Sequence, residues 1–145
     1  MTRRLLILDV VVDVVVRTAL VFAFFLLFSG HNAPGGGFIA GLVAGICLIL
    51  LYVARGEAEM RSLIRVRPEQ MLGVGLLLAL LAGSAGWIWG GGFLESGILE
   101  LEIPVLGVVK VPSALVFDIG VFAVVVGLTA ALVSSVGDEV EGGHW

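Results

Sequence analysis

Asp118 is the residue of this chain whose position most suggests chemistry, because it lies inside a long apolar run. It follows Pro112 by six residues, which in a helix rising about 1.5 Å per residue places it roughly 9 Å inside the hydrocarbon region. A charged carboxylate at that depth costs about 3 kcal/mol or more unless it is hydrated, paired or protonated. One interpretation is therefore a carboxylate that relays a proton or a cation. The other is a carboxylate that only fixes an assembly, through a hydrogen bond to a neighbouring subunit.

Asp9, Asp13 and Arg17 form a second group of ionisable residues at the start of an apolar run. They are spaced four residues apart, so a helix places all three on one side. The acid precedes the base in the Asp13 and Arg17 pair, which is the favourable order for an ion pair within a helix. We expect this ion pair near the cytoplasmic interface. A second interpretation is that the three residues line the cytoplasmic mouth of an ion path.

Membrane-spanning helices must position these side chains. Of the 145 residues, 59% are hydrophobic and 14% are charged, and the mean hydropathy is +1.15. A hydrocarbon core of about 30 Å requires roughly 20 apolar residues of helix. The sequence predicts an all-α membrane protein, a single membrane domain over residues 1–145. Its four transmembrane helices are expected at about 8–28, 37–54, 70–89 and 112–135.

The basic residues predict the orientation of these helices, because cytoplasmic loops retain Lys and Arg. Arg3 and Arg4 precede the first span, whereas the later external segments carry only Lys110. The connection between the second and third spans is rich in arginine: Arg55, Arg61, Arg65 and Arg67. An N-in, C-in topology satisfies this distribution.

The segment between the third and fourth spans has the pattern of a short hairpin. Residues 98–103 alternate apolar and acidic side chains, and residues 108–111 could pair back across a turn at Leu106 and Gly107. We expect a short extracellular β-hairpin-like loop here.

A glycine-rich turn joins the first two spans. Its chemistry-bearing residue is His31, which could titrate near neutral pH or could hydrogen-bond backbone groups and hold the turn in place. Glycines permit close backbone approach, and Pro34 suits the first turn of a helix. The motif comprises His31, Asn32, Pro34, Gly35, Gly36, Gly37 and Phe38.

Small residues recur at helix-packing spacing in the second and fourth spans. Gly37, Gly41 and Gly45 are consecutive four-residue steps, and Gly120 and Gly127 share a stripe of the fourth span. Asp118 projects nearly opposite Gly120, so this helix has two faces that do not suit lipid. We expect one of these faces to meet another subunit.

Other functional classes find little support. The single Cys47 excludes an intrachain disulfide and a thiolate metal cluster. The sequence has no pair of nucleophile and base and no cluster of metal ligands. Its glycine triplet leads into a membrane helix and does not belong to a nucleotide-binding βαβ unit. We therefore expect no enzymatic activity, no cofactor, no metal and no nucleic-acid partner.

Three parts of the sequence together resemble one family. They are Arg17, the stretch LFSGHNAPGGGFIAGL at 27–42, and FDIGV at 117–121. These resemble the B subunit of the Mrp-type multisubunit cation/proton antiporters of prokaryotic cell membranes, and the resemblance covers nearly the whole chain. Asp9 and Asp13 do not match the family pattern clearly.

The resemblance implies a small accessory subunit that is needed for assembly and activity of a complex exchanging Na⁺, sometimes K⁺, for protons. Its implied partners are the other subunits, including large ones similar to the antiporter-like subunits of respiratory complex I, and the lipid bilayer. Asp118 is the position that the motif marks as a contributor to a cation path. The alternatives are a purely structural scaffold, the equivalent subunit of a membrane-bound hydrogenase-type complex, and an autonomous small transporter.

Overall fold

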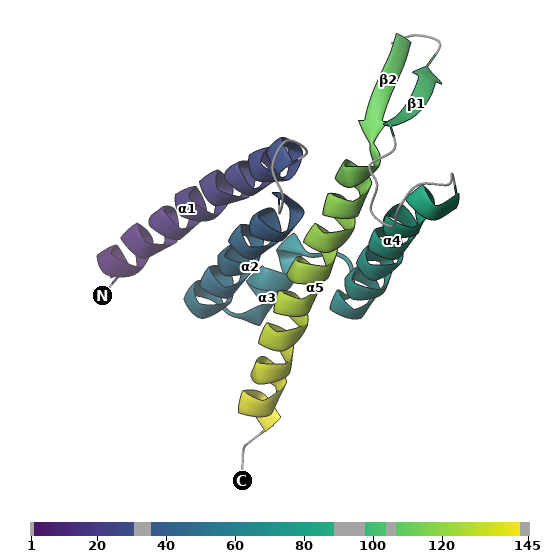
Figure 1. Cartoon of the computed structure of the whole chain (residues 1–145). Coiled ribbons are helices and arrows are strands. Elements are labelled where there is room, and N and C mark those ends of the chain that lie inside the picture. Colours follow the sequence, from purple (N-terminus) through teal and green to yellow (C-terminus); the bar gives the residue numbers. More distant parts are fainter. Residues whose placement is uncertain (1, 31–35, 89–97, 104–106, 143–145) are drawn as a thin grey trace.

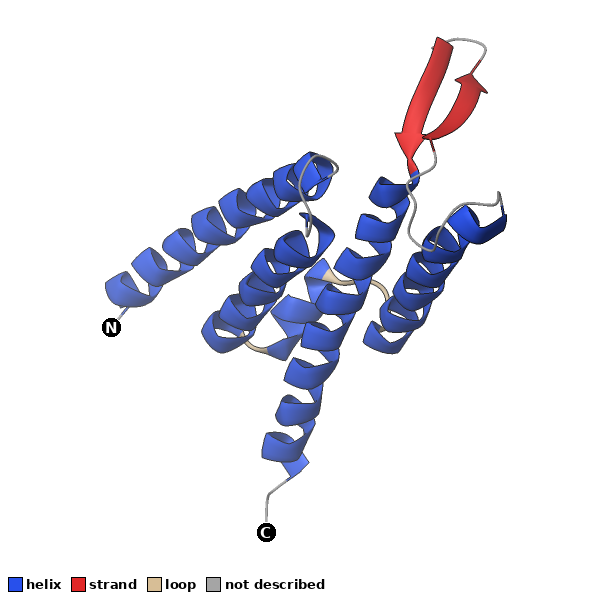
Figure 2. Ribbon diagram, in the orientation of Figure 1, coloured by secondary structure: helices blue, strands red, loops and turns tan. Residues whose placement is uncertain are grey.

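The protein is almost entirely helical (Figure 2). The computed structural model describes residues 2–30, 36–88, 98–103 and 107–142, with side chains described at 7–30, 36–84 and 114–136. Its elements in chain order are α1 (Thr2–Ser29), α2 (Gly36–Arg55), α3 (Glu57–Leu63), α4 (Pro68–Ile88), β1 (Ile98–Ile103), β2 (Gly107–Pro112) and α5 (Ser113–Gly142).

Four of these helices, α1, α2, α4 and α5, contain the apolar runs predicted to cross the membrane, which confirms four spans. Each is long and apolar enough to do so by length and composition. The boundaries differ by a few residues, since α1 begins at Thr2 and α5 continues to Gly142. Both extensions add polar or charged residues beyond the apolar runs.

The helices lie in a row whose spatial order differs from the chain order (Figure 1). Helix α2 packs between α1 and α5, and α4 packs against the other side of α5. A row of helices leaves each helix with faces that no other part of the chain covers. Large apolar side chains on all four long helices are accordingly exposed, among them Phe25, Ile46, Leu81 and Leu132.

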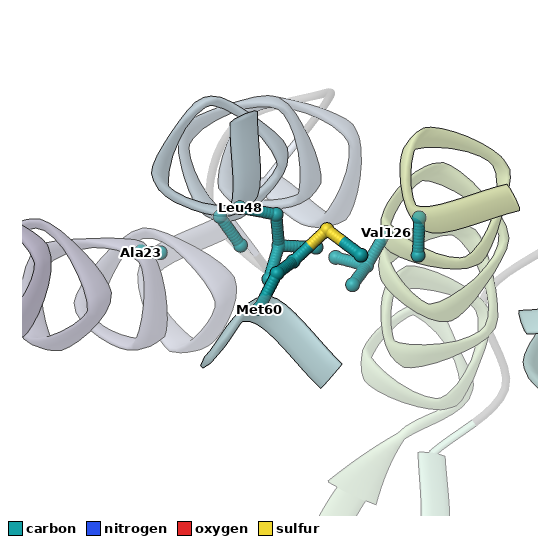
Figure 3. Packing of buried hydrophobic residues seen from close by; sticks show 6 residues of the cluster. Ala23, Leu48, Met60 and Val126 are labelled. Carbon is teal, nitrogen blue, oxygen red and sulfur yellow. The ribbon is translucent and has the colours of Figure 1, made fainter. Parts of the chain in front are cut away.

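Helix α3 lies at the face of the molecule at which α2 ends and α4 begins. Gly56 joins α2 to α3 with a φ of 88°, a left-handed conformation that glycine adopts without strain. Met60 of α3 is 1% exposed and packs among Ala23, Leu48 and Val126 (Figure 3). A methionine of the short α3 thus lies in the apolar core that residues of α1, α2 and α5 form together.

The segment before α5 contains two antiparallel strands. Leu101 pairs with Val109, and Glu100 pairs with Lys110. The strands extend beyond the start of α5, away from the helices (Figure 1). The expected turn position was wrong, because Gly107 is part of β2 and pairs with Ile103. Residues 104–106, which connect the strands, lie outside the described residues.

Glycines allow close approach of α2 to α5. A methyl group added at Gly41 would lie 2.8 Å from Cβ of Val125, and one at Gly45 would lie 2.8 Å from Oγ1 of Thr129. Carbon atoms do not approach one another or oxygen this closely, so larger residues would force the helices apart. The face of α2 that carries these glycines is therefore covered by α5.

Helix α5 has glycines of its own, and these lie on the face that packs against α4. A methyl group at Gly120 would lie 2.7 Å from the backbone nitrogen of Ala79, and one at Gly127 would lie 3.0 Å from that of Leu72. Helix α5 does have two faces that are kept from lipid, but α2 and α4 of the same chain cover both. The expectation that another subunit covers one of them was wrong, because α5 inserts between α2 and α4.

Candidate functional site

Asp118 lies where three helices meet, close to the beginning of α5. The residue is 9% exposed and is the one buried charged residue among the described side chains. Gly37 of α2 packs directly on the main chain of Asp118, so that any side chain at Gly37 would overlap it. At Gly30, the residue after α1, an added methyl group would lie 3.1 Å from Oδ2 of Asp118. The carboxylate is thus enclosed by the end of α1 and the start of α2.

The glycine-rich motif and Asp118 are 80 or more residues apart in the sequence but adjacent in space. The first four residues of the motif, His31, Asn32, Pro34 and Gly35, lie outside the described residues. Gly30 and Gly36, which flank them, pack backbone to backbone, and a Cβ on either would overlap the other's Cα. Gly30, just before the motif, and Gly37, near its end, therefore both lie beside Asp118. The last residue of the motif, Phe38, is 51% exposed.

The first turn of α2 gives this junction a defined electrostatic character. The backbone amides of a helix's first turn have no partner within the helix and carry partial positive charge, which favours a nearby anion. Gly36 and Gly37 are both buried, so their amides lie in a region of low dielectric constant beside α5. The glycine at position 37 lets the backbone approach Asp118, and the glycine at position 36 lets it approach Gly30.

The second ionisable group surrounds Arg55, at the opposite end of the long helices from Asp118. Arg17 pairs with Asp13 at 2.6 Å, as the spacing on α1 predicts. Arg55, at the end of α2, pairs through Nη1 with Asp13 at 3.2 Å and through Nε with Asp9 at 3.4 Å. Glu59 of α3 lies 3.5 Å from the same Nη1. We call these five residues the Arg55 network.

Arg55 was missed as a member of this group by sequence reasoning, which used it only to orient the helices. It also donates a hydrogen bond from Nη2 to the main-chain oxygen of Asp9 at 2.7 Å. The sequence did contain a signal for this pairing. The first two spans are joined by a short turn and are therefore antiparallel, which places the start of the first span beside the end of the second. Asp13 and Arg55 occupy those two places.

The two groups are separated by nearly the whole length of a span. Gly37 beside Asp118 and Arg55 are 18 residues apart on α2, or about 27 Å at about 1.5 Å per residue. Residues 38–54 of α2 and 119–136 of α5 contain no Asp, Glu, His, Lys or Arg. No group of three or more His, Cys, Asp or Glu in the described part of the chain is arranged to hold a metal ion.

Fold and site together define a four-span membrane protein with one buried carboxylate at a helix junction and an exposed charged network at the opposite end. Residues 7–131 match the family described as "Domain related to MnhB subunit of Na+/H+ antiporter". The chain belongs to this family and is a multi-pass protein of the prokaryotic plasma membrane.

Individual relatives agree with this family membership. The chain is 40% identical over 134 residues to the B subunit of the Na(+)/H(+) antiporter of Bacillus subtilis, covering 92% of this chain and 94% of that protein. It is 38% identical over 110 residues, 76% of its length, to the combined A/B subunit of a probable K(+)/H(+) antiporter of Rhizobium meliloti. This second match covers 11% of the Rhizobium protein.

A solved structure shares the fold. The match is to the Mrp complex from Dietzia sp. DQ12-45-1b, with a TM-score of 0.75 and 28% identity, over 94% of this chain. The chain corresponds to 14% of the matched chain in that complex. The B-type fold therefore occurs both as a short separate protein and as a small part of a much longer chain.

Proposed function

We propose that this chain is a membrane subunit of a multisubunit Na⁺/H⁺ antiporter, that it is needed for assembly of the complex, and that Asp118 contributes to an ion path. The observation that carries the proposal is the enclosure of the buried Asp118 by the backbone at Gly30, just after α1, and at Gly37 of α2. An intramembrane carboxylate is costly and is most often functional. Its partners are the other subunits of the complex, including the large complex-I-like ones, and the transported ions are Na⁺ and H⁺.

The distribution of ionisable residues supports a subunit rather than an autonomous transporter. Asp118 and the Arg55 network lie at opposite ends of the helices, and residues 38–54 and 119–136 between them include no Asp, Glu, His, Lys or Arg. Protons and cations cross a membrane by way of such groups or of water held by them. A path that uses Asp118 must therefore continue through another chain.

We further propose that both termini and the Arg55 network face the cytoplasm. The start of α1 and the end of α5 lie on the same side of the molecule as α3 (Figure 1). Arg55, Arg61, Arg65 and Arg67 occur on this side, whereas the strands at the other side carry Lys110 as their cation. The excess of arginine favours the cytoplasmic assignment. Asp118 then lies near the external surface, where protons enter.

The test of the transport role is Na⁺-driven proton movement in everted vesicles that contain the complete complex with Asp118→Asn. Exchange is divided by the amount of assembled complex on a native gel. We expect normal assembly and a fall in exchange of roughly tenfold or more, as for the loss of a proton-transferring group. Asp118→Glu, which keeps a carboxylate in a slightly larger side chain, is the matched variant and should retain part of the exchange.

A structural scaffold is the second candidate, and the packing of Gly37 on the main chain of Asp118 favours it. In that case the carboxylate only fixes the junction. Asp118→Asn would then reduce the amount of assembled complex while leaving the exchange per assembled complex unchanged. This result would overturn the ion-path role and leave the family membership of the chain intact.

A further inference from the structure

A cavity of about 520 Å³ lies apart from both the Asp118 junction and the Arg55 network. Its walls come from α3, the connection 64–67, the first residues of α4 and the later part of α5. It is therefore situated at the end of the helical row where α2 ends and α4 begins. In a protein that spans a bilayer, this is the level of one membrane surface.

The lining of the cavity is strongly basic. Arg61, Arg65 and Arg67 all contribute to it, against one acidic residue, Glu69. Arg61 is paired with Glu57 at 2.5 Å, whereas Arg65 and Arg67 form no ion pair with any residue that the structure describes. Two guanidinium groups at the edge of the cavity are thus available to an anion. Guanidinium groups bind phosphate oxygens in a planar, bidentate geometry.

Ser134 adds an independent indication of a polar ligand. The residue is 8% exposed and lines the cavity, and its Oγ has no hydrogen-bond partner among the described residues. Other hydroxyls in the helices, those of Thr129 and Ser135, donate to the carbonyl one turn earlier. A buried hydroxyl without a partner is unfavourable. A ligand oxygen in the cavity would supply the missing acceptor.

Apart from Ser135, the remaining walls are apolar. Met60 and Ile64 line one side, and Ala130 and Ala131 of α5 line the other. A free inorganic anion has no apolar groups to pack on this surface. The glycerol and the first carbons of a lipid's acyl chains could pack on it. The combination of a basic rim, a buried hydroxyl and apolar walls at a membrane surface fits a lipid headgroup.

We propose that this cavity binds the phosphate headgroup of an anionic phospholipid. Arg65 and Arg67 donate to the phosphate oxygens, and Ser134 donates to an oxygen of the headgroup or of the glycerol. The proposal rests on the membrane-spanning fold and does not depend on the ion-path role of Asp118. Bound lipid would add a further link between α3, α4 and α5 at the membrane surface, beside the apolar cluster that already contains Met60, Met71 and Ala130.

The test uses the complete complex, purified in a mild detergent and titrated with phosphatidylglycerol, phosphatidylcholine or inorganic phosphate. The readouts are the midpoint of thermal unfolding and the lipid retained in native mass spectrometry. We expect phosphatidylglycerol alone to raise the midpoint and to remain bound. The double variant Arg65→Gln and Arg67→Gln should require roughly tenfold more phosphatidylglycerol for the same rise, as expected for the loss of charge-assisted contacts.

The matched control is Arg3→Gln with Arg4→Gln, which removes the same charge from the same side of the chain but away from the cavity. It should respond to phosphatidylglycerol like the unchanged complex. Ser134→Ala should weaken retention less than the double arginine variant and leave assembly intact. An equal response of the two double variants would overturn the proposal, because a nonspecific charge effect would then explain the binding.

Two further outcomes would also overturn it. Stabilisation by inorganic phosphate as large as that by phosphatidylglycerol would identify a free-anion site. Loss of a partner protein from the complex of Arg65→Gln and Arg67→Gln, with no response of the unchanged complex to any lipid, would identify an acidic segment of that partner protein as the occupant.

Discussion

The Asp118 junction and the Arg55 network place carboxylates in opposite kinds of environment. Asp118 is buried between backbones, with Gly30 and Gly37 packed against it. Asp9 and Asp13 have side chains that are 57% and 38% exposed, and their partners are the long side chains of arginines. The junction is therefore fixed by main-chain packing, whereas the network is fixed by side chains that can rearrange.

This difference has a consequence for energetics. Exposed ion pairs contribute about 0–1 kcal/mol each and are weakened by salt. A side chain forced between two packed backbones has no comparable freedom to adjust, and overpacking in such places costs about 1–3 kcal/mol or more. We therefore expect substitutions at the junction to have much larger effects than substitutions in the network.

The largest effect is expected for Gly37→Ala. The new methyl group would overlap the main-chain carbonyl of Asp118, so α2 and α5 must separate at the junction. We expect a destabilisation of about 3 kcal/mol or more, seen as a marked loss of assembled complex on a native gel. Gly73→Ala is the matched control, because nothing lies within 4 Å of a Cβ at Gly73. Equal assembly of the two variants would show that the junction is not closely packed.

Arg55→Gln is the strongest test of the network. Arg55 is 22% exposed at its side chain and reaches three carboxylates on two other helices. Its loss should cost about 1–2 kcal/mol, between the values for exposed and buried ion pairs, and should lower the midpoint of thermal unfolding of the complex. The difference from the unchanged protein should shrink at high salt. A salt-independent loss as large as that of Gly37→Ala would contradict the distinction between the two regions.

Arg17→Gln should have the smallest effect. Its side chain is 79% exposed and pairs with Asp13, which retains Arg55 as a partner when Arg17 is removed. We expect a change below about 0.5 kcal/mol in the same thermal measurement. If exchange nevertheless fell strongly in vesicles while assembly was normal, Arg17 would belong to an ion path and the network would have more than a structural role.

Several features of the site could be predicted from sequence because they depend on local spacing. The position of Asp118 within an apolar run and the pairing of Asp13 with Arg17 four residues later both follow from the geometry of a single helix. Arg55 as their shared partner did not follow from that geometry, because it requires two helices to be placed side by side. The same holds for the cavity beside Arg65 and Arg67.

The order of the helices in space was likewise not predictable from local pattern. Small residues at Gly41 and Gly120 marked faces suited to close packing, but the pattern does not say which helix each face meets. The expectation that another subunit covers one face of α5 was wrong for this reason. Because α5 inserts between α2 and α4, helices of the same chain cover both faces of α5.

The sequence by itself determined the four apolar spans, the position of Asp118 within the last of them and the places where backbones can approach closely. These properties depend on residue type and on the fixed rise of a helix. The tertiary structure decided that the end of α1 and the start of α2 enclose Asp118, and that Arg55 joins α1, α2 and α3. Such contacts bring together residues far apart in the chain, and they depend on how the helices pack as a set.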